Sequence, residues 1–158
     1  MSATVAERPV DPAGPPAAVR QSVVLWLGAI LAGVAEALVH LAGPVPPTGP
    51  ELAVRAGIYL VLAVLVLQLH TGRDAIRWTV VVVLGVFGTL SLVVEPFRAL
   101  LAGASAAEFL VAASGPELLA AALRALHVAE VLAALVLLFH PAARRFFRGP
   151  QRVPAGIR

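Results

Sequence analysis

Four stretches of nearly unbroken apolar residues, separated by short polar or proline-rich segments, dominate the chain. Each is close to the roughly 20 residues that an α-helix needs to cross a membrane. The four spans are expected at about residues 22–42, 52–69, 76–94 and 117–139. The pattern therefore predicts an all-α protein, a four-helix transmembrane bundle whose membrane domain covers residues 21–140.

Turn-forming residues separate the spans. The loop GPVPPTGPE follows the first span, the turn HTGRD precedes the third, and Glu-Pro at 95–96 and His-Pro at 140–141 are expected to end the third and fourth spans. Between those two spans, the stretch 104–113 fits either a short helix on the outer membrane interface, with Glu108 facing water, or a loose loop.

The two ends of the chain are predicted to lie outside the bundle. Residues 1–20 contain four prolines and few large apolar side chains, which is typical of a disordered tail. No cleavable signal peptide is expected, because the apolar run begins late and contains a Glu. Residues 141–158 form a basic tail in which two phenylalanines lie at headgroup level and three arginines bind anionic lipid headgroups: Arg144, Arg145 and Arg148.

Composition supports the membrane class. Hydrophobic residues make up 59% of the 158 residues and charged residues 13%, against about 25% charged in soluble domains. The absence of cysteine excludes disulfides, zinc–thiolate sites and iron–sulfur clusters. Every basic residue is an Arg, which we attribute to GC-rich codon usage, and a nucleic-acid partner is not expected because no folded basic surface is predicted.

The positions of the arginines predict the orientation. Nine of the twelve fall on the side shared by the N-tail, the turn at 70–77 and the C-tail. Because cytoplasmic loops carry an excess of positive charge, both termini are expected in the cytoplasm. Trp26 and Trp78 lie toward the same side and are expected to act as interfacial anchors.

Polar residues in two spans recur on one helix face. In the first span, residues spaced alternately four and three apart share a face: Ser22, Trp26, Ala29, Gly33, Glu36, His40 and Gly43. The same spacing in the fourth span joins Ala120, Leu123, His127, Glu130, Ala134 and Leu137, with Arg124 one position to the side. Small residues on both faces let helices approach closely, so these ionisable residues should point into the bundle.

Nearly all ionisable residues at membrane depth fall in the outer half of the bilayer. We therefore predict one polar cluster there, made of Glu36, His40, Arg55, Glu95, Arg98, Arg124, His127 and Glu130. Glu95 and Arg98 are also interpreted as a local ion pair that ends the third span.

Three interpretations of the cluster follow. The first is an interhelical ion-pair network, with Glu36 bound to Arg124 or Arg55 and Glu130 to His127, in a non-catalytic structural or accessory protein. Such a network could also receive a partner subunit or a second copy of the chain. The second is a proton-coupled transporter or solute-binding protein that uses Glu36, with Glu130 as a further candidate for a protonatable carboxylate.

The third interpretation is a metal or haem site built from the carboxylates and imidazoles. The spacings E-x-x-x-H and H-x-x-E differ from the usual bundle di-metal pattern, and His40 lies nearer the surface than His127. We therefore expect no resident metal or cofactor. No phosphate-binding loop, Cys nucleophile or Ser-His-Asp order is present, so an enzyme is not expected.

Two resemblances accompany these patterns. TGRDAIRWTVVVVLGVFGTLSL and LVLLFHPAARRFFR resemble uncharacterised small four-span integral membrane proteins of actinobacteria. The resemblance implies the fold and the inner membrane of a bacterial cell, but no activity. LGAILAGVAEAL at 27–38 is similar to the first span of small multidrug resistance transporters, which would give that family's functional Glu to Glu36. The longer connection before the fourth span and the Arg124-His127-Glu130 group depart from that family, so we interpret this likeness as one of composition.

Overall fold

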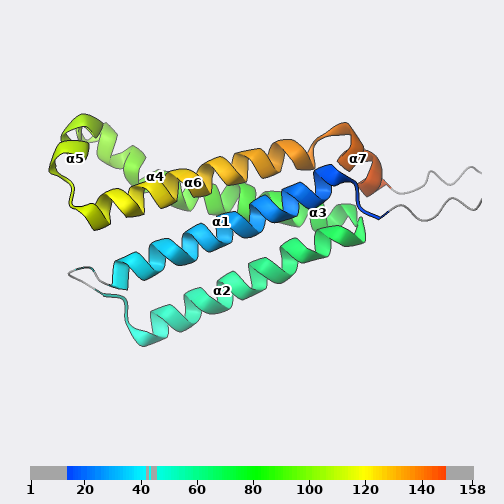
Figure 1. The fold of residues 1–158 in the computed structure, drawn as a ribbon, viewed down its shortest axis with the longest axis horizontal. Coiled ribbons are helices and arrows are strands. Elements are labelled where there is room, and N and C mark those ends of the chain that lie inside the picture. Colours follow the sequence, from blue (N-terminus) through cyan, green and yellow to red (C-terminus); the bar gives the residue numbers. More distant parts are fainter. Residues whose placement is uncertain (1–13, 42, 44–45, 149–158) are drawn as a thin grey trace, which may run out of the picture.

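Four long helices lie side by side in the computed structural model, which describes residues 14–41, 43 and 46–148 (Figure 1). The first span is α1 (Ala17–Leu41), and the second is α2 (Gly49–Leu67), continued by the short 3₁₀ helix η1 (Gln68–Thr71). The third combines α3 (Asp74–Val80), η2 (Val81–Gly88) and α4 (Thr89–Leu101), and the fourth is α6 (Gly115–Leu138).

Two short helices complete the bundle at its opposite ends. α5 (Ala106–Ala112) connects the third and fourth spans, and α7 (Pro141–Arg148) follows the fourth (Figure 1). We call these the α5 end and the α7 end. The described residues contain no strand, and all four spans are long and apolar enough to cross a membrane. The predicted all-α four-helix bundle is confirmed.

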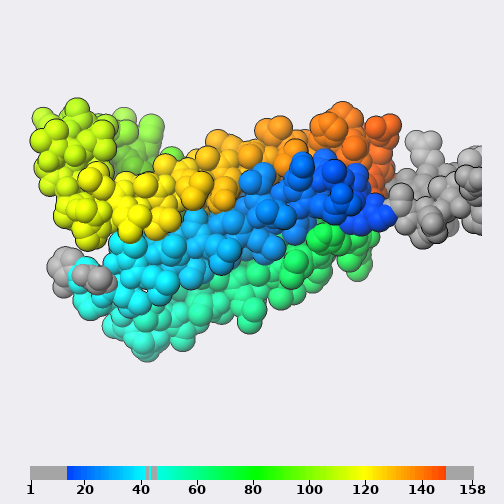
Figure 2. All heavy atoms as spheres, viewed as in Figure 1, coloured from blue at the N-terminus to red at the C-terminus, as the bar shows by residue number. Residues whose placement is uncertain are grey.

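The closest helix pair is α1 with α6, whose atoms touch along their length (Figure 2). Ser22 and Trp26 are fully buried, and the Ser22 hydroxyl donates a hydrogen bond of 2.9 Å to the carbonyl of Ala134. Ala29 and Gly33 continue the same buried face of α1, where their small size lets the backbones approach. The predicted face of the first span is thus confirmed as far as Glu36, while His40 lies exposed beyond it.

The apolar core occupies the half of the bundle nearest the α7 end. Its fully buried members include Val19, Val66, Val80 and Leu138. At the α5 end packing is sparse, since α4 contains no buried residue and the first half of α6 contains none either. The apolar side chains exposed there are of the kind that lipid covers in a membrane bundle.

A π-helix lies in the middle of the third span. Residues Val81–Gly88 follow the i→i+5 hydrogen-bond pattern, which widens the turn and is rare in proteins. Gly85 lies against Leu135 of α6, and a Cβ atom at Gly85 would come within 3.2 Å of the leucine side chain. The wide turn changes the rotational position of α4, whose Leu92 and Glu95 line a cavity together with Gly88 at the end of η2.

The third span does not end at 95–96. α4 continues to Leu101 with Pro96 inside it, and the helix terminates where Gly103 adopts a φ of 94°. Proline removes one backbone donor from a helix, but the residues after it can continue the helical path. Glycine ends the helix because it adopts this left-handed conformation without steric cost.

Matching sequences begin the two helices that start at the α5 end. The backbone N–H of Thr48 donates to Glu51 Oε2 at 2.8 Å, and that of Ser114 donates to Glu117 Oε2 at 2.7 Å. Each pair encloses Gly-Pro, with proline in the first turn where its missing N–H costs nothing. Both helix starts are therefore closed by their own carboxylates.

Both predicted tails are too long, because helices α1 and α7 include some of their residues. α1 already begins at Ala17, and residues 1–13 lie outside the described part of the chain. Residues 141–148 form α7, in which Ala143 is fully buried and Phe147 is 3% exposed, while 149–158 lie outside the described part. The expectation of phenylalanines at headgroup level is wrong for Phe147, because α7 folds back onto the core.

A buried arginine holds α7 in place. The Arg77 guanidinium lies 5.3 Å from the ring centre of Trp78 and 5.5 Å from those of Phe139 and Phe147, within range of cation–π attraction. It also forms an ion pair of 3.2 Å with Asp74. Arg77 therefore joins α3 to the end of α6 and to α7.

The two tryptophans occupy different environments. Trp78 is about half exposed at the α7 end, where an interfacial anchor is expected, but Trp26 is fully buried against α6. The interfacial expectation for Trp26 is wrong, because its place on the small-residue face of α1 directs it into the core.

Replacing Phe147 with Ala should destabilise the bundle. The change removes a buried ring and one wall around Arg77, and large core truncations of this kind cost about 3 kcal/mol. Phe109→Ala on α5, where the ring is 45% exposed, is the matched control. Unfolding of the purified variants in detergent should show a clear loss for Phe147→Ala only, and equal losses would contradict the packing of α7.

Candidate functional site

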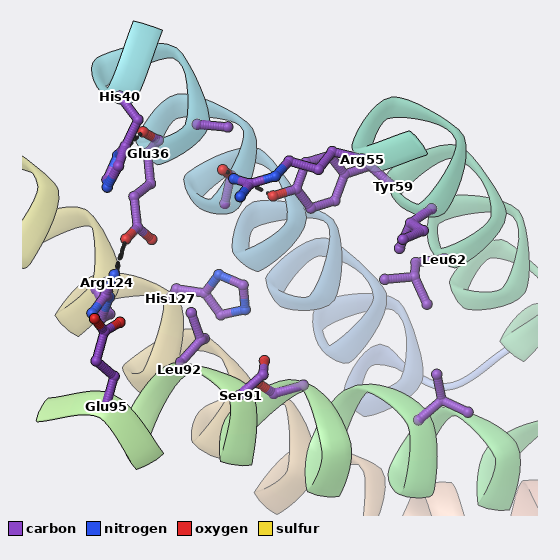
Figure 3. A pocket seen from close by; sticks show the side chains of 15 residues that line it. Glu36, His40, Arg55, Tyr59, Leu62, Ser91, Leu92, Glu95, Arg124 and His127 are labelled. Carbon is purple, nitrogen blue, oxygen red and sulfur yellow. Dashed lines mark hydrogen bonds and ion pairs between the residues drawn. The ribbon is translucent and has the colours of Figure 1, made fainter. Parts of the chain in front are cut away.

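A cavity of about 570 Å³ opens between the four spans toward the α5 end (Figure 3). α1, α2, α6 and the η2–α4 segment all contribute to its wall. Seven apolar or glycine residues line it, together with eight polar ones: Glu36, His40, Arg55, Tyr59, Ser91, Glu95, Arg124 and His127. The cavity lies where the core of small and apolar residues ends.

An ion pair between α1 and α6 forms one wall. Arg124 donates from Nε and Nη2 to the same oxygen, Glu36 Oε1, at 3.0 and 2.6 Å. Glu36 is 8% exposed, whereas the Arg124 side chain is 31% exposed. No donor to Glu36 Oε2 occurs among the described residues, so this oxygen is available beside the cavity.

Gly33 leaves room for the side chains that form the inner end of the cavity. A Cβ atom there would lie 3.3 Å from Tyr59 Oη and 3.5 Å from the His127 ring. Tyr59 donates a hydrogen bond of 3.1 Å to the Gly33 carbonyl. His127 Nδ1 is buried and has no hydrogen-bond partner in the described part of the chain.

Opposite charges remain unpaired on two walls. Arg55 on α2 and Glu95 on α4 are both exposed, and neither has an ion-pair or hydrogen-bond partner within 14–41, 43 and 46–148. Figure 3 shows Glu36, Arg124 and Glu95 gathered on one side, with Arg55 and Tyr59 on another. His40 is tied to its own helix, since Nδ1 lies 2.8 Å from the Glu36 carbonyl.

The structure brings together six of the eight residues predicted for the cluster. Glu36 with Arg124 is one of the predicted pairs, but Arg98 and Glu130 do not line the cavity. No Glu130–His127 bond and no Glu95–Arg98 ion pair occur among the described residues. Glu130 lies deeper, on the predicted face of α6 and against Gly28 of α1, and residue spacing along one helix does not reveal which residue of another helix it meets.

Two polar residues of the cavity escaped prediction. Tyr59 is the single tyrosine of the chain and follows Arg55 by one helical turn, a spacing that could have shown a shared face. Ser91 lines the cavity because of the π-helix before it, and its hydroxyl donates to the Gly88 carbonyl at 2.7 Å.

The basic residues of α7 lie apart from the cavity, at the other end of the bundle. Arg144, Arg145 and Arg148 are exposed. In the described residues, no group of three His, Asp or Glu side chains could hold a metal ion.

No family model, curated protein or solved structure matches this chain. Its site is therefore interpreted from its own residues alone.

The Glu36–Arg124 pair should show energetic coupling. Glu36→Gln and Arg124→Gln each leave one charge without its partner in a partly dry site, so the double variant should lose less stability than the sum of the single variants. We expect a coupling energy of about 1 to 2 kcal/mol.

Combining Glu108→Gln with Arg124→Gln is the control, since Glu108 is exposed on α5 and should add independently. Unfolding in detergent measures both cycles. If the stability losses of Glu36→Gln and Arg124→Gln were additive, the two side chains would not interact energetically.

Proposed function

We propose that this multi-pass membrane protein binds a small polar solute in the cavity beside Glu36, and that the preferred solute is zwitterionic. The observation that carries the proposal is the pair of unpaired opposite charges, Arg55 and Glu95, on different walls of one cavity. A ligand with both charges would satisfy them together, whereas an ion of one sign would leave the other charge unpaired.

The remaining polar atoms fit the same ligand. Glu36 Oε2 and Glu95 lie on one side of the cavity and can accept from an ammonium group. Arg55 can donate to a carboxylate or phosphate from the other side. The volume of about 570 Å³ is within the range of small-molecule pockets.

The proposed role is binding without catalysis. Beyond the cavity, toward the α7 end, the bundle is filled by buried side chains such as Trp26, Leu84 and Val131. A solute in the cavity thus meets a closed bundle in this conformation. The Glu36–Arg124 pair also supports a structural or accessory role for the protein, because it joins α1 to α6 and fixes one wall of the cavity.

The proposal includes an orientation. The first turn of α1, the turn before α3 and α7 share one end, which presents five exposed arginines: Arg20, Arg73, Arg144, Arg145 and Arg148. Arg77 lies buried at the same end. The positive-inside tendency then places this end in the cytoplasm of a bacterial inner membrane, and the cavity in the outer half. The exposed arginines of α7 are proposed to contact anionic headgroups.

Ligand binding can be tested by thermal stabilisation. A ligand that binds only the folded state stabilises by about 2.7 kcal/mol at a hundredfold excess over its Kd. Amino acids and betaines should raise the Tm of the purified protein, whereas matched monoamines and monocarboxylates should raise it less.

Variants that remove single charges test whether the ligand binds in the cavity. Arg55→Gln and Glu95→Gln should each weaken binding about tenfold, as expected for loss of one charge-assisted hydrogen bond. Arg98→Gln, on the same helix as Glu95 but outside the cavity, should bind normally. No stabilisation by any zwitterion, or equal losses in all three variants, would contradict the proposal.

The orientation is testable because the chain lacks cysteine. Single replacements Glu108→Cys and Arg148→Cys place a thiol at exposed positions on α5 and α7. A membrane-impermeant maleimide added to spheroplasts should label position 108 at once and position 148 only after lysis. The reverse order would invert the proposed topology.

A further inference from the structure

Glu130 lies near the middle of α6, away from the cavity, and packs directly onto α1. A Cβ atom at Gly28 would come within 2.5 Å of Glu130 Oε1 and 3.0 Å of the carboxyl carbon. Oε2 is buried and has no hydrogen-bond partner in the part of the chain that the structure describes. The carboxyl group thus rests where the α1 helix has no side chain.

Among the residues that the structure describes, no opposite charge faces this carboxyl group. On α1, the nearest ionisable residues to Gly28 along the sequence are Arg20 and Glu36, each eight positions away. On α6 the nearest is His127, whose ring lies at Gly33 rather than at Gly28, and η2 contains no ionisable residue. Arg124 on α6 is held by Glu36.

A carboxylate in such surroundings is costly. An unpaired charge in an apolar medium lacks both hydration and a counter-ion, and the group is neutralised by taking up a proton. The helical rise of about 1.5 Å per residue puts Glu130 only about 5 Å from the midpoint of α6. Both membrane surfaces are therefore remote from it, and the cavity reaches His127, one turn away, but is not lined by Glu130.

We propose that Glu130 is a proton-binding site of the membrane interior, separate from the cavity, which holds its proton at neutral pH. The neutral acid packs against Gly28, and release of the proton would leave a charge that favours departure from this apolar contact. The group gives the bundle a proton-exchanging position about two helical turns deeper than Glu36–Arg124.

A lipid-soluble carbodiimide tests this assignment in the full-length protein in liposomes. Dicyclohexylcarbodiimide adds to a protonated carboxyl: the acid proton moves to one nitrogen, a carboxyl oxygen bonds to the central carbon, and an O-to-N acyl shift gives a stable N-acylurea. Mass spectrometry at neutral pH should show one added carbodiimide, located on Glu130 and absent from Glu130→Gln.

Glu36 is the internal control, because it also lies in the bundle but as the carboxylate partner of Arg124. It should remain unlabelled in the native chain and become labelled in Arg124→Gln. The infrared carbonyl band of a protonated carboxylic acid should be present in the native protein and lost in Glu130→Gln. Absence of both the label and the band from Glu130 at neutral pH would overturn the proposal.

Gly28→Ala tests the contact itself. The added methyl group would displace the flexible end of Glu130 rather than backbone, so folding should be retained. Labelling of Glu130 should become several-fold faster because the carboxyl group is moved out of the helix contact. An unchanged rate would show that Gly28 does not shelter this group. Leu31→Ala, at an exposed position of the same helix, serves as the control for a change in α1.

Discussion

The close approach of α1 and α6 is the constraint on which the rest of this structure depends. Lipid is as apolar as leucine, so membrane helices associate through packing and interhelical hydrogen bonds rather than through the hydrophobic effect. Ser22, Ala29 and Gly33 provide the small surface, and the Ser22 hydroxyl reaches the Ala134 carbonyl. At the far end of this contact the ion pair of Glu36 with Arg124 continues the joining of the two helices.

The cavity begins where the contact between α1 and α6 ceases to be apolar. α2 and the third span pack closely only near the α7 end, where residues such as Val66, Leu69 and Val80 complete the core. Toward the α5 end they contribute polar side chains instead, among them Arg55, Tyr59 and Glu95. One helix pair thus serves as a fixed support, while the other two helices form the remaining walls of an opening.

The sequence predicted those features that depend on helix periodicity and composition. The four spans, the buried face of α1 and the Glu36–Arg124 pair could be found because apolar length and a regular spacing determine them. The fold of α7 could not be found, because it depends on a contact between distant parts of the chain. Trp26 was placed both on the buried face of α1 and at the interface, and its position on the face decides its burial.

The same limit applies within the polar cluster. Residues at similar depth were expected to meet, and Glu95 does line the cavity, but Glu130 rests on Gly28 and Arg98 lies outside the cavity. Depth along a helix can be read from residue number, but the direction of a side chain around the helix requires a known rotation. An extra residue per turn in η2 changes that rotation for every residue after it.

The π-helix therefore affects the geometry of the site. The third span is anchored at its start by Val80 and Leu84, and its far part has no buried residue of its own. The rotation of α4 about its own axis is consequently determined by the eight residues of η2 rather than by packing against neighbouring helices. The π-helix, which ends two turns before Glu95, thus determines the direction of this carboxylate on the acidic side of the cavity. The charge that a solute would meet therefore depends on the hydrogen-bond pattern of the backbone as much as on the identity of residue 95.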